Sequence, residues 1–131
     1  YRARLSAIPG MSLCGYDPAE RNNFQYVVVE YTPAEGCVTR DELIRVLWAE
    51  NAIVRKYFWP GCHRMEPYRS LYPDAAARLP HTEAVAARLL ILPTGTGMTL
   101  YGIERLCDLL ALTVANGPAV HERLAAIDAA G

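Results

Sequence analysis

Hydrophobic residues occur along the chain in two patterns, unbroken runs typical of strands and repeated spacings typical of helices. Residues 24–31 are almost all β-branched or aromatic, which predicts a strand buried on both faces or at the centre of a sheet. Shorter apolar runs at 11–14, 53–58 and 89–92 predict further strands. Because a helical segment separates 24–31 from 53–58, these two strands can lie side by side in a parallel or an antiparallel arrangement.

The first long helix is predicted to begin after Thr39. Thr39 and Glu42 have the spacing of a capping box, in which each side chain binds the backbone amide of the other residue. Apolar residues then recur every three or four positions as far as Glu50. A helix is therefore expected over 40–50.

Further helices are predicted in the second half of the chain. Residues 80–88 indicate a helix with proline in its first turn, and a short helical turn is expected at 68–72. The last third has an apolar stripe typical of a helix packed on a sheet, formed by Ile103, Leu106, Cys107, Leu110 and Val114. A second helix with a thinner stripe follows the break at 116–118.

Length and element order predict the fold class. The chain has 131 residues, of which 52% are hydrophobic, so it can bury the core of one domain spanning residues 1–131. We expect an α+β domain in which about three strands form a small, mostly antiparallel sheet and helices cover one face.

The richest candidate for chemistry is the segment 55–68, which reads RKYFWPGCHRMEPY. It crowds aromatic, basic, imidazole and carboxylate side chains directly after a predicted strand. Trp59 precedes a proline and is therefore biased to extended geometry, and Pro60-Gly61 indicates a turn. The segment is expected to display residues 62–66 at the end of the strand, where loops commonly carry function.

Charge and cysteine content narrow the function classes. Lys and Arg number 13 against 14 Asp and Glu, so the chain lacks the basic excess of a nucleic-acid-binding protein. The four cysteines have no CxxC spacing and the three histidines lie far apart, so no metal site is expected. No apolar run reaches the length of a membrane span, and without a signal-like segment the cysteines indicate the reducing cytoplasm.

Several motifs, taken in order, resemble one family. They are the strand at 23–29, the helix start at 40–43, the loop with its tyrosine, proline, histidine and Pro-Tyr, and a closing segment with Leu79-Pro80, Thr82-Glu83, Arg88 and residues 92–97. Together they resemble the C-terminal small domain of DegT-type sugar-nucleotide aminotransferases. The resemblance implies a fold-type I pyridoxal-phosphate enzyme that transfers an amino group, typically from glutamate, to a nucleotide-linked keto-deoxysugar.

The resemblance also implies a division of labour. The cofactor would be bound mainly by a large domain preceding Tyr1, and the active site would form at domain and homodimer boundaries. Lys56 is the only lysine, and it does not match the cofactor lysine of the family. We therefore expect no catalytic, cofactor-binding or metal residue in this chain, and no activity from the chain alone.

Substrate recognition is the role left to this domain. His63 matches the histidine of the family loop, for which the resemblance implies contact with the sugar nucleotide. Tyr57 and Arg64 flank it, and they offer a hydroxyl donor and a guanidinium fork for phosphate. Each of the three also has a structural interpretation, as a backbone-bonded histidine, a packed tyrosine and a solvated arginine.

Two other classes of function stay open. The chain can be a free-standing module that binds a small molecule at the 59–68 loop, or an assembly domain that dimerises through an open sheet face. Within the family, some relatives are sugar dehydratases that use the same cofactor, so the sequence also leaves the reaction type open.

Overall fold

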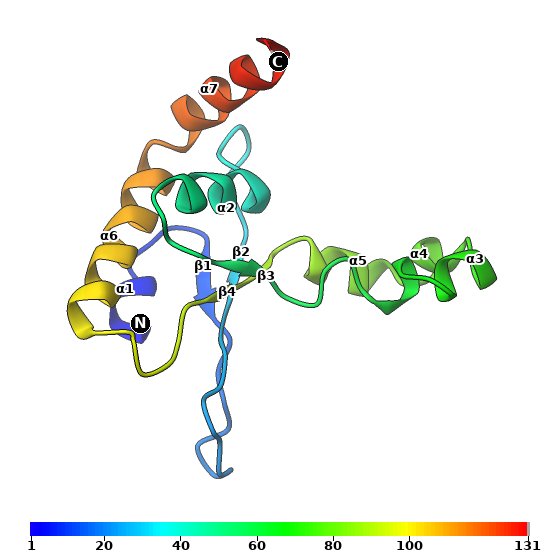
Figure 1. The fold of residues 1–131 in the computed structure, drawn as a ribbon, viewed down its shortest axis with the longest axis horizontal. Coiled ribbons are helices and arrows are strands. Elements are labelled where there is room, and N and C mark those ends of the chain that lie inside the picture. Colours follow the sequence, from blue (N-terminus) through cyan, green and yellow to red (C-terminus); the bar gives the residue numbers. More distant parts are fainter. Residues whose placement is uncertain (131) are drawn as a thin grey trace.

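A four-stranded antiparallel sheet forms the centre of the protein in the computed structural model, which describes residues 1–130 (Figure 1). The strands are β1 (Met11–Leu13), β2 (Val27–Tyr31), β3 (Arg55–Lys56) and β4 (Leu89–Leu92), in the order β1-β2-β4-β3. All three pairings are antiparallel, with Met11 opposite Tyr31, Val29 opposite Leu90 and Arg55 opposite Ile91. The predicted α+β class with an antiparallel sheet is confirmed.

All four predicted strands are present; 89–92 has the predicted bounds, whereas the strands predicted at 11–14, 24–31 and 53–58 are shorter than expected. β2 is paired on both sides, as a strand at the centre of a sheet should be, but it begins only at Val27. Phe24 has a positive φ of 50° and is 64% exposed, so it lies outside the strand. The prediction that 53–58 can pair with β2 was wrong, because β4 lies between β2 and β3.

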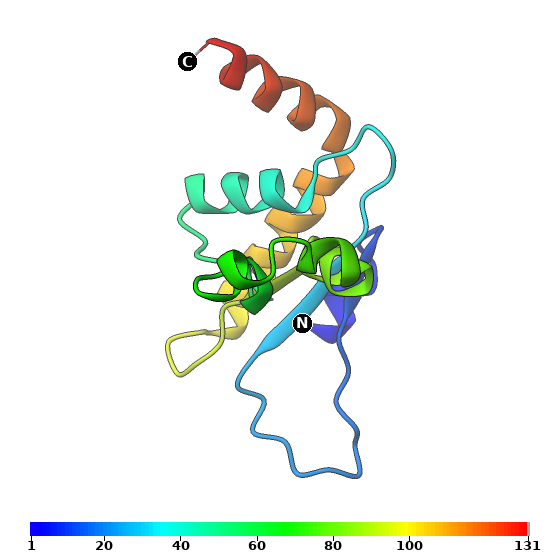
Figure 2. The same cartoon turned by 90° about the vertical axis from the view of Figure 1, so that its right-hand side faces the viewer.

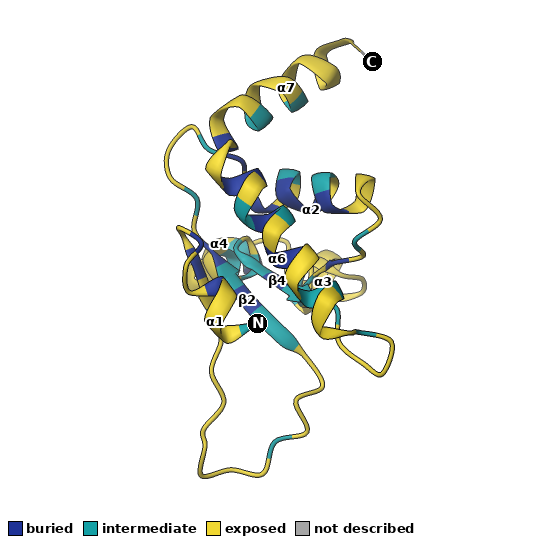
Figure 3. Ribbon diagram, turned by 90° about the vertical axis from the view of Figure 1, so that its left-hand side faces the viewer, coloured by how far each residue is buried: buried dark blue, intermediate teal, exposed yellow. Residues whose placement is uncertain are grey.

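Helices cover one face of the sheet and form the core with it. These are α1 (Arg2–Leu5), α2 (Arg40–Ala49) and α6 (Leu100–Ala115). Helix α6 lies on the opposite side of the sheet from the segment that joins β3 to β4 (Figures 1 and 2). The buried residues of β2 and β4 alternate with half-exposed ones, so only one sheet face is fully covered (Figure 3). Four of the five stripe residues of α6 are buried, namely Leu106, Cys107, Leu110 and Val114.

The segment between β3 and β4 projects from the sheet as an arm, which we define as residues 57–88 (Figure 1). It consists of a 3-10 turn, η1 (Cys62–Arg64), and three short helices, α3 (Tyr68–Leu71), α4 (Ala75–Arg78) and α5 (Pro80–Ala86). The predicted helical turn at 68–72 and the helix with Pro80 in its first turn are both present. Only Ala75 is buried within these four elements, so the arm has little core of its own.

A second projection is the long loop that joins β1 to β2 (Figure 2). Its aromatic residues are partly exposed, and Tyr16 and Phe24 contact each other edge to face with ring centroids 5.3 Å apart. The Tyr16 hydroxyl donates to the backbone carbonyl of Tyr26 at 2.6 Å, which ties the two sides of the loop together.

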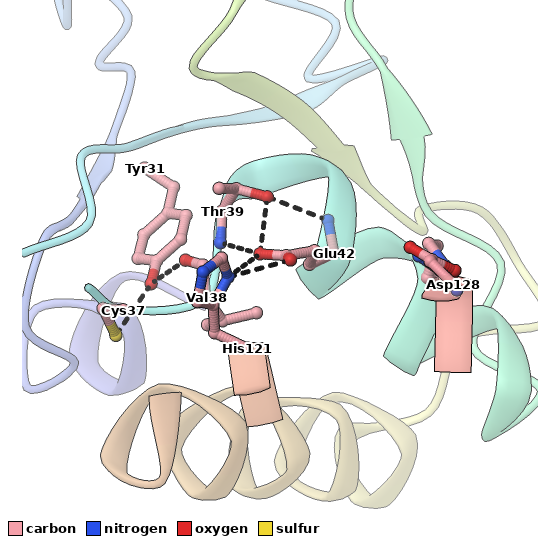
Figure 4. A network of polar contacts seen from close by, with 8 residues as sticks. Tyr31, Cys37, Val38, Thr39, Glu42, His121 and Asp128 are labelled. Atoms are coloured by element: carbon pink, nitrogen blue, oxygen red, sulfur yellow. Dashed lines mark hydrogen bonds and ion pairs between the residues drawn. The ribbon is translucent and has the colours of Figure 1, made fainter. Parts of the chain in front are cut away.

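The C-terminal helix α7 (Gly117–Ala130) is attached to α2 through polar contacts (Figure 4). His121 Nδ1 lies 2.9 Å from Glu42 Oε1, and Arg45 makes a two-pronged ion pair with Asp128 at 2.8 and 2.9 Å. Glu42 also completes the capping box with Thr39, so that prediction is confirmed. Gly117 is the only buried residue of α7, in keeping with its thin apolar stripe (Figure 3).

No helix within residues 1–130 combines the length and the apolar character needed to cross a membrane.

The arm is fixed to the domain by Arg40, whose side chain is only 3% exposed. Its Nη1 donates to the backbone carbonyls of Ala86 at 3.0 Å and Leu89 at 2.6 Å, on either side of the junction between α5 and β4. Its Nε donates to Asp41 at 2.5 Å. A buried guanidinium with satisfied donors holds the end of the arm at the start of α2.

Replacing Arg40 tests this attachment. We expect Arg40→Met to lower the free energy of unfolding by about 3 kcal/mol, because two part-buried carbonyls and Asp41 lose their donor. The matched control is Arg45→Met, which removes a half-exposed arginine from the same helix and should cost at most about 1 kcal/mol. Urea unfolding measures both, and equal losses would contradict the assignment.

Candidate functional site

An apolar groove of about 810 Å³ lies at the root of the arm. Its walls come from the end of β3, the loop that follows it and α5. Its lining includes Tyr57, Phe58, Trp59, Gly61 and His63 from the loop and Val85 from α5. A groove of this size, mostly apolar with a few polar groups, is typical of small-molecule sites.

The backbone after β3 turns sharply enough to place this loop against α5. Phe58 and Gly61 have positive φ values of 45° and 89°, and the loop then closes into η1, where the Arg64 amide donates to the Gly61 carbonyl at 3.0 Å. A β-carbon on Gly61 would lie 2.9 Å from His63 Cε1. Glycine is therefore needed here both for its conformation and to make room for the imidazole.

Two cations lie over the indole of Trp59, which lines the groove. Arg40 lies 5.0 Å and Lys56 4.8 Å from the centre of a ring of the indole. The Lys56 Nζ also donates to Asp41 at 2.6 Å. Partial burial opposes ionisation of Asp41, yet the hydrogen bond from Lys56 and the charge of Arg40 hold its pKa below the usual value.

His63 and Arg64 both bind Glu83, in the first turn of α5. His63 Nε2 lies 2.5 Å from Glu83 Oε1, and Arg64 donates through Nε at 2.7 Å and through Nη2 at 2.6 Å. The two hydrogen bonds from Arg64, followed by the contact with His63, lower the pKa of Glu83 to about 2. The carboxylate is ionised at neutral pH and joins the loop to α5.

The three predicted site residues come together only in part. Tyr57 and His63 line the groove, whereas Arg64 lines a second hollow of about 430 Å³, which we call the arginine hollow. His63 also lines the arginine hollow and lies between the two. Its side chain is only 9% exposed, because Glu83 occupies one ring edge and Gly61 packs against the other.

Tyr57 is the freest donor of the three. Its ring contacts Tyr26 edge to face at 6.1 Å between centroids and Phe58 at 4.4 Å. The Tyr57 hydroxyl makes no hydrogen bond within residues 1–130. It is therefore available to a ligand in the groove.

The described chain does not fit pyridoxal phosphate by itself. That cofactor requires a lysine amine, and Lys56 is engaged by Asp41 and by the ring of Trp59. Among residues 1–130 no group of three His, Cys, Asp or Glu side chains is arranged to hold a metal ion.

Two residues that organise the site were not selected from the sequence. Glu83 belonged to a motif of the resemblance, but no local pattern pairs it with His63 or Arg64. It lies 20 residues from His63 and 19 residues from Arg64 in the sequence. Arg40 follows the capping threonine and belonged to another motif of the resemblance, the helix start at 40–43. Neither residue type nor spacing indicates its burial.

The comparisons with known proteins give the class. Residues 1–111 match the DegT/DnrJ/EryC1/StrS aminotransferase family, and the chain belongs to this family. The aminotransferases of this family depend in general on pyridoxal phosphate.

Two relatives carry more specific names. The chain is 27% identical over 110 residues to dTDP-4-amino-4,6-dideoxy-D-glucose transaminase of Escherichia coli. This match covers 84% of this chain and 29% of that protein. It is 43% identical to DesI, whose crystal structure was analysed in the presence of its TDP-sugar product, with a TM-score of 0.82. That match covers 93% of this chain and 30% of DesI, so the chain spans under a third of each relative.

The contact between Gly61 and His63 can be tested against a glycine without such a neighbour. Gly36→Ala places a β-carbon at a φ of 70° with no atom within 4 Å, so it should cost only backbone strain, about 1 kcal/mol. Gly61→Ala adds a collision with the imidazole and should cost about 2–3 kcal/mol in unfolding free energy. Equal costs, measured by urea unfolding, would mean that His63 does not depend on Gly61.

The depressed pKa of Glu83 predicts how the arm responds to acid. A carboxyl with a lowered pKa contributes stability above its usual value of 4.5, and this contribution is lost as the pH falls toward about 2. The side-chain carboxyl carbon of Glu83, followed by NMR, should titrate near 2, and Arg64→Ala should raise the midpoint. A midpoint near 4.5 in the unsubstituted chain would contradict the ion pair.

Proposed function

We propose that this chain is the C-terminal small domain of a pyridoxal-phosphate-dependent aminotransferase acting on a nucleotide-linked keto-deoxysugar in amino-sugar biosynthesis. The observation that carries the proposal is the likeness to DesI, at 43% identity and a TM-score of 0.82 over 93% of this chain. A relative whose structure was analysed with a TDP-sugar makes a nucleotide sugar the first candidate substrate.

The residues of this chain would bind the substrate and leave the reaction to the rest of the enzyme. In such an enzyme pyridoxal phosphate supplies the chemistry that carries the amino group between donor and acceptor. Tyr57 would donate its free hydroxyl to the substrate in the groove. Arg64 would donate its remaining N–H groups to phosphate, and His63 would form the wall between the two hollows.

The other partners in this proposal are a glutamate amino donor and a second copy of the protein. The apolar groove and the projecting arm, on which Phe58 is 76% exposed, offer a surface that a second copy would cover in a homodimer. The four free cysteines agree with a cytoplasmic enzyme. Glutamate, the dimer, the cytoplasmic location and the large cofactor domain stay predictions. So do the alternatives of a dehydratase and of a module without catalysis, which no observation favours.

The test uses the complete protein that contains this chain, with pyridoxal phosphate, glutamate and a dTDP-linked 4-keto-6-deoxysugar. We expect an amino sugar and 2-oxoglutarate, detected by mass spectrometry, and no turnover from residues 1–131 alone. His63→Ala should lower kcat/KM for the sugar nucleotide about tenfold, because a wall of the site is lost, and leave cofactor absorbance unchanged.

The control is His121→Ala, which removes a histidine on α7 that also faces a glutamate and lies outside both hollows. Its kcat/KM should stay within about twofold of the unsubstituted enzyme. A complete protein that aminates no nucleotide-linked keto-sugar would refute the proposed function. Loss of cofactor absorbance in His63→Ala would instead make His63 a structural residue.

A further inference from the structure

The arginine hollow contains two guanidinium groups, and each contacts a carboxylate through its Nε and Nη2 atoms. Arg64 uses Nε and Nη2 on Glu83, and Arg69 uses Nε at 2.8 Å and Nη2 at 2.7 Å on Glu66. Neither group has a partner for Nη1 within residues 1–130. Each arginine is therefore fixed by a carboxylate and keeps one nitrogen with two donors for a ligand.

The rest of the hollow suits a flat ring. Trp59 and Tyr72 contribute aromatic side chains to a lining that also includes Arg64 and Arg69. The base of a nucleotide stacks on aromatic faces, and guanidinium groups donate to phosphate oxygens. This pairing of chemistries matches a nucleoside diphosphate better than a simple sugar or an apolar molecule.

The anchors of the two arginines differ. Glu66 precedes Arg69 by three residues in the same turn, so their ion pair is local, and both side chains are about half or more exposed. Glu83 instead joins α5 to a loop far away in sequence, is 28% exposed, and also binds the nearly buried imidazole of His63. The position of Arg64 in the hollow depends on this one carboxylate.

We propose that Glu83 is a positioning residue that holds the Arg64 guanidinium for the diphosphate of a nucleotide bound in the arginine hollow. This deepens the proposed function, on which it rests, by assigning the nucleotide part of the substrate to this hollow. Because each cation is paired with a carboxylate, the hollow recognises its ligand by geometry rather than by net charge. Affinity should therefore fall only weakly with salt.

The experiment measures binding of thymidine diphosphate to the complete protein by calorimetry. Glu83→Ala and Arg64→Ala should each weaken binding about tenfold, because an oriented charged hydrogen bond is lost. Glu83→Gln keeps the size of the side chain and one acceptor oxygen, so it should fall between Glu83→Ala and the unsubstituted protein. Asp74→Ala removes an exposed carboxylate that pairs with Arg78 on the same arm, and it should leave the affinity within about twofold.

Equal affinity in the unsubstituted protein and Glu83→Ala would overturn the proposal, as would the absence of any binding. A purely structural role for Glu83 would show as parallel losses of melting temperature and affinity in Glu83→Ala, with no recovery in Glu83→Gln; that result also overturns it. Binding is measured without turnover, so a protein that bound the diphosphate as expected but aminated no sugar would refute only the proposed reaction.

A second readout uses the side-chain nitrogen signals of His63 and His121 in the complete protein, each assigned by substituting that histidine. If Glu83 accepts from His63, Nε2 carries a proton in the unsubstituted chain at neutral pH. Glu83→Ala should change the His63 nitrogen shifts and leave those of His121 unchanged. A His63 tautomer protonated at Nδ1 alone would overturn the assignment of Glu83.

Discussion

The buried guanidinium of Arg40 is the interaction on which the candidate site depends. An arm with almost no buried residues cannot fix its own position, and the ends of α5 and β4 supply carbonyls that need donors. Arg40 satisfies these carbonyls and also lies over Trp59, so one side chain holds the returning strand and the loop at the base of the groove. A buried charge is tolerated here because Asp41 and the carbonyls surround it.

Local sequence rules predicted the elements of this domain well. The capping box at Thr39 and Glu42 formed as expected, because both partners lie within one helical turn. The stripe of α6 was buried against the sheet for the same reason, since helical spacing alone decides which side chains share a face. The strand order was not predictable, because β4 pairs between β2 and β3 although the whole arm separates it from β3 in the sequence.

The candidate site was predicted as a segment and not as a set of contacts. Composition drew attention to the segment 55–68, and the family resemblance selected His63 with its neighbours Tyr57 and Arg64. The structure places Tyr57 and His63 at the groove and Arg64 at the arginine hollow. Their partner Glu83 comes from another helix, and such a pairing depends on the tertiary fold. Lys56 shows the same limit, because the sequence did not indicate the contacts with Asp41 and Trp59 that the structure gives it.

The first turn of α2 has three consecutive charged residues with three different destinations. Arg40 faces the arm, Asp41 joins Arg40 to Lys56 of β3, and Glu42 accepts from His121 of α7 (Figure 4). The family model matches as far as residue 111, so α7 lies outside the residues that it matches and yet contacts the same turn as the site. When this turn is ordered, the contacts to the arm, to β3 and to α7 can all form. These parts are therefore thermodynamically linked, although they do not surround a common pocket.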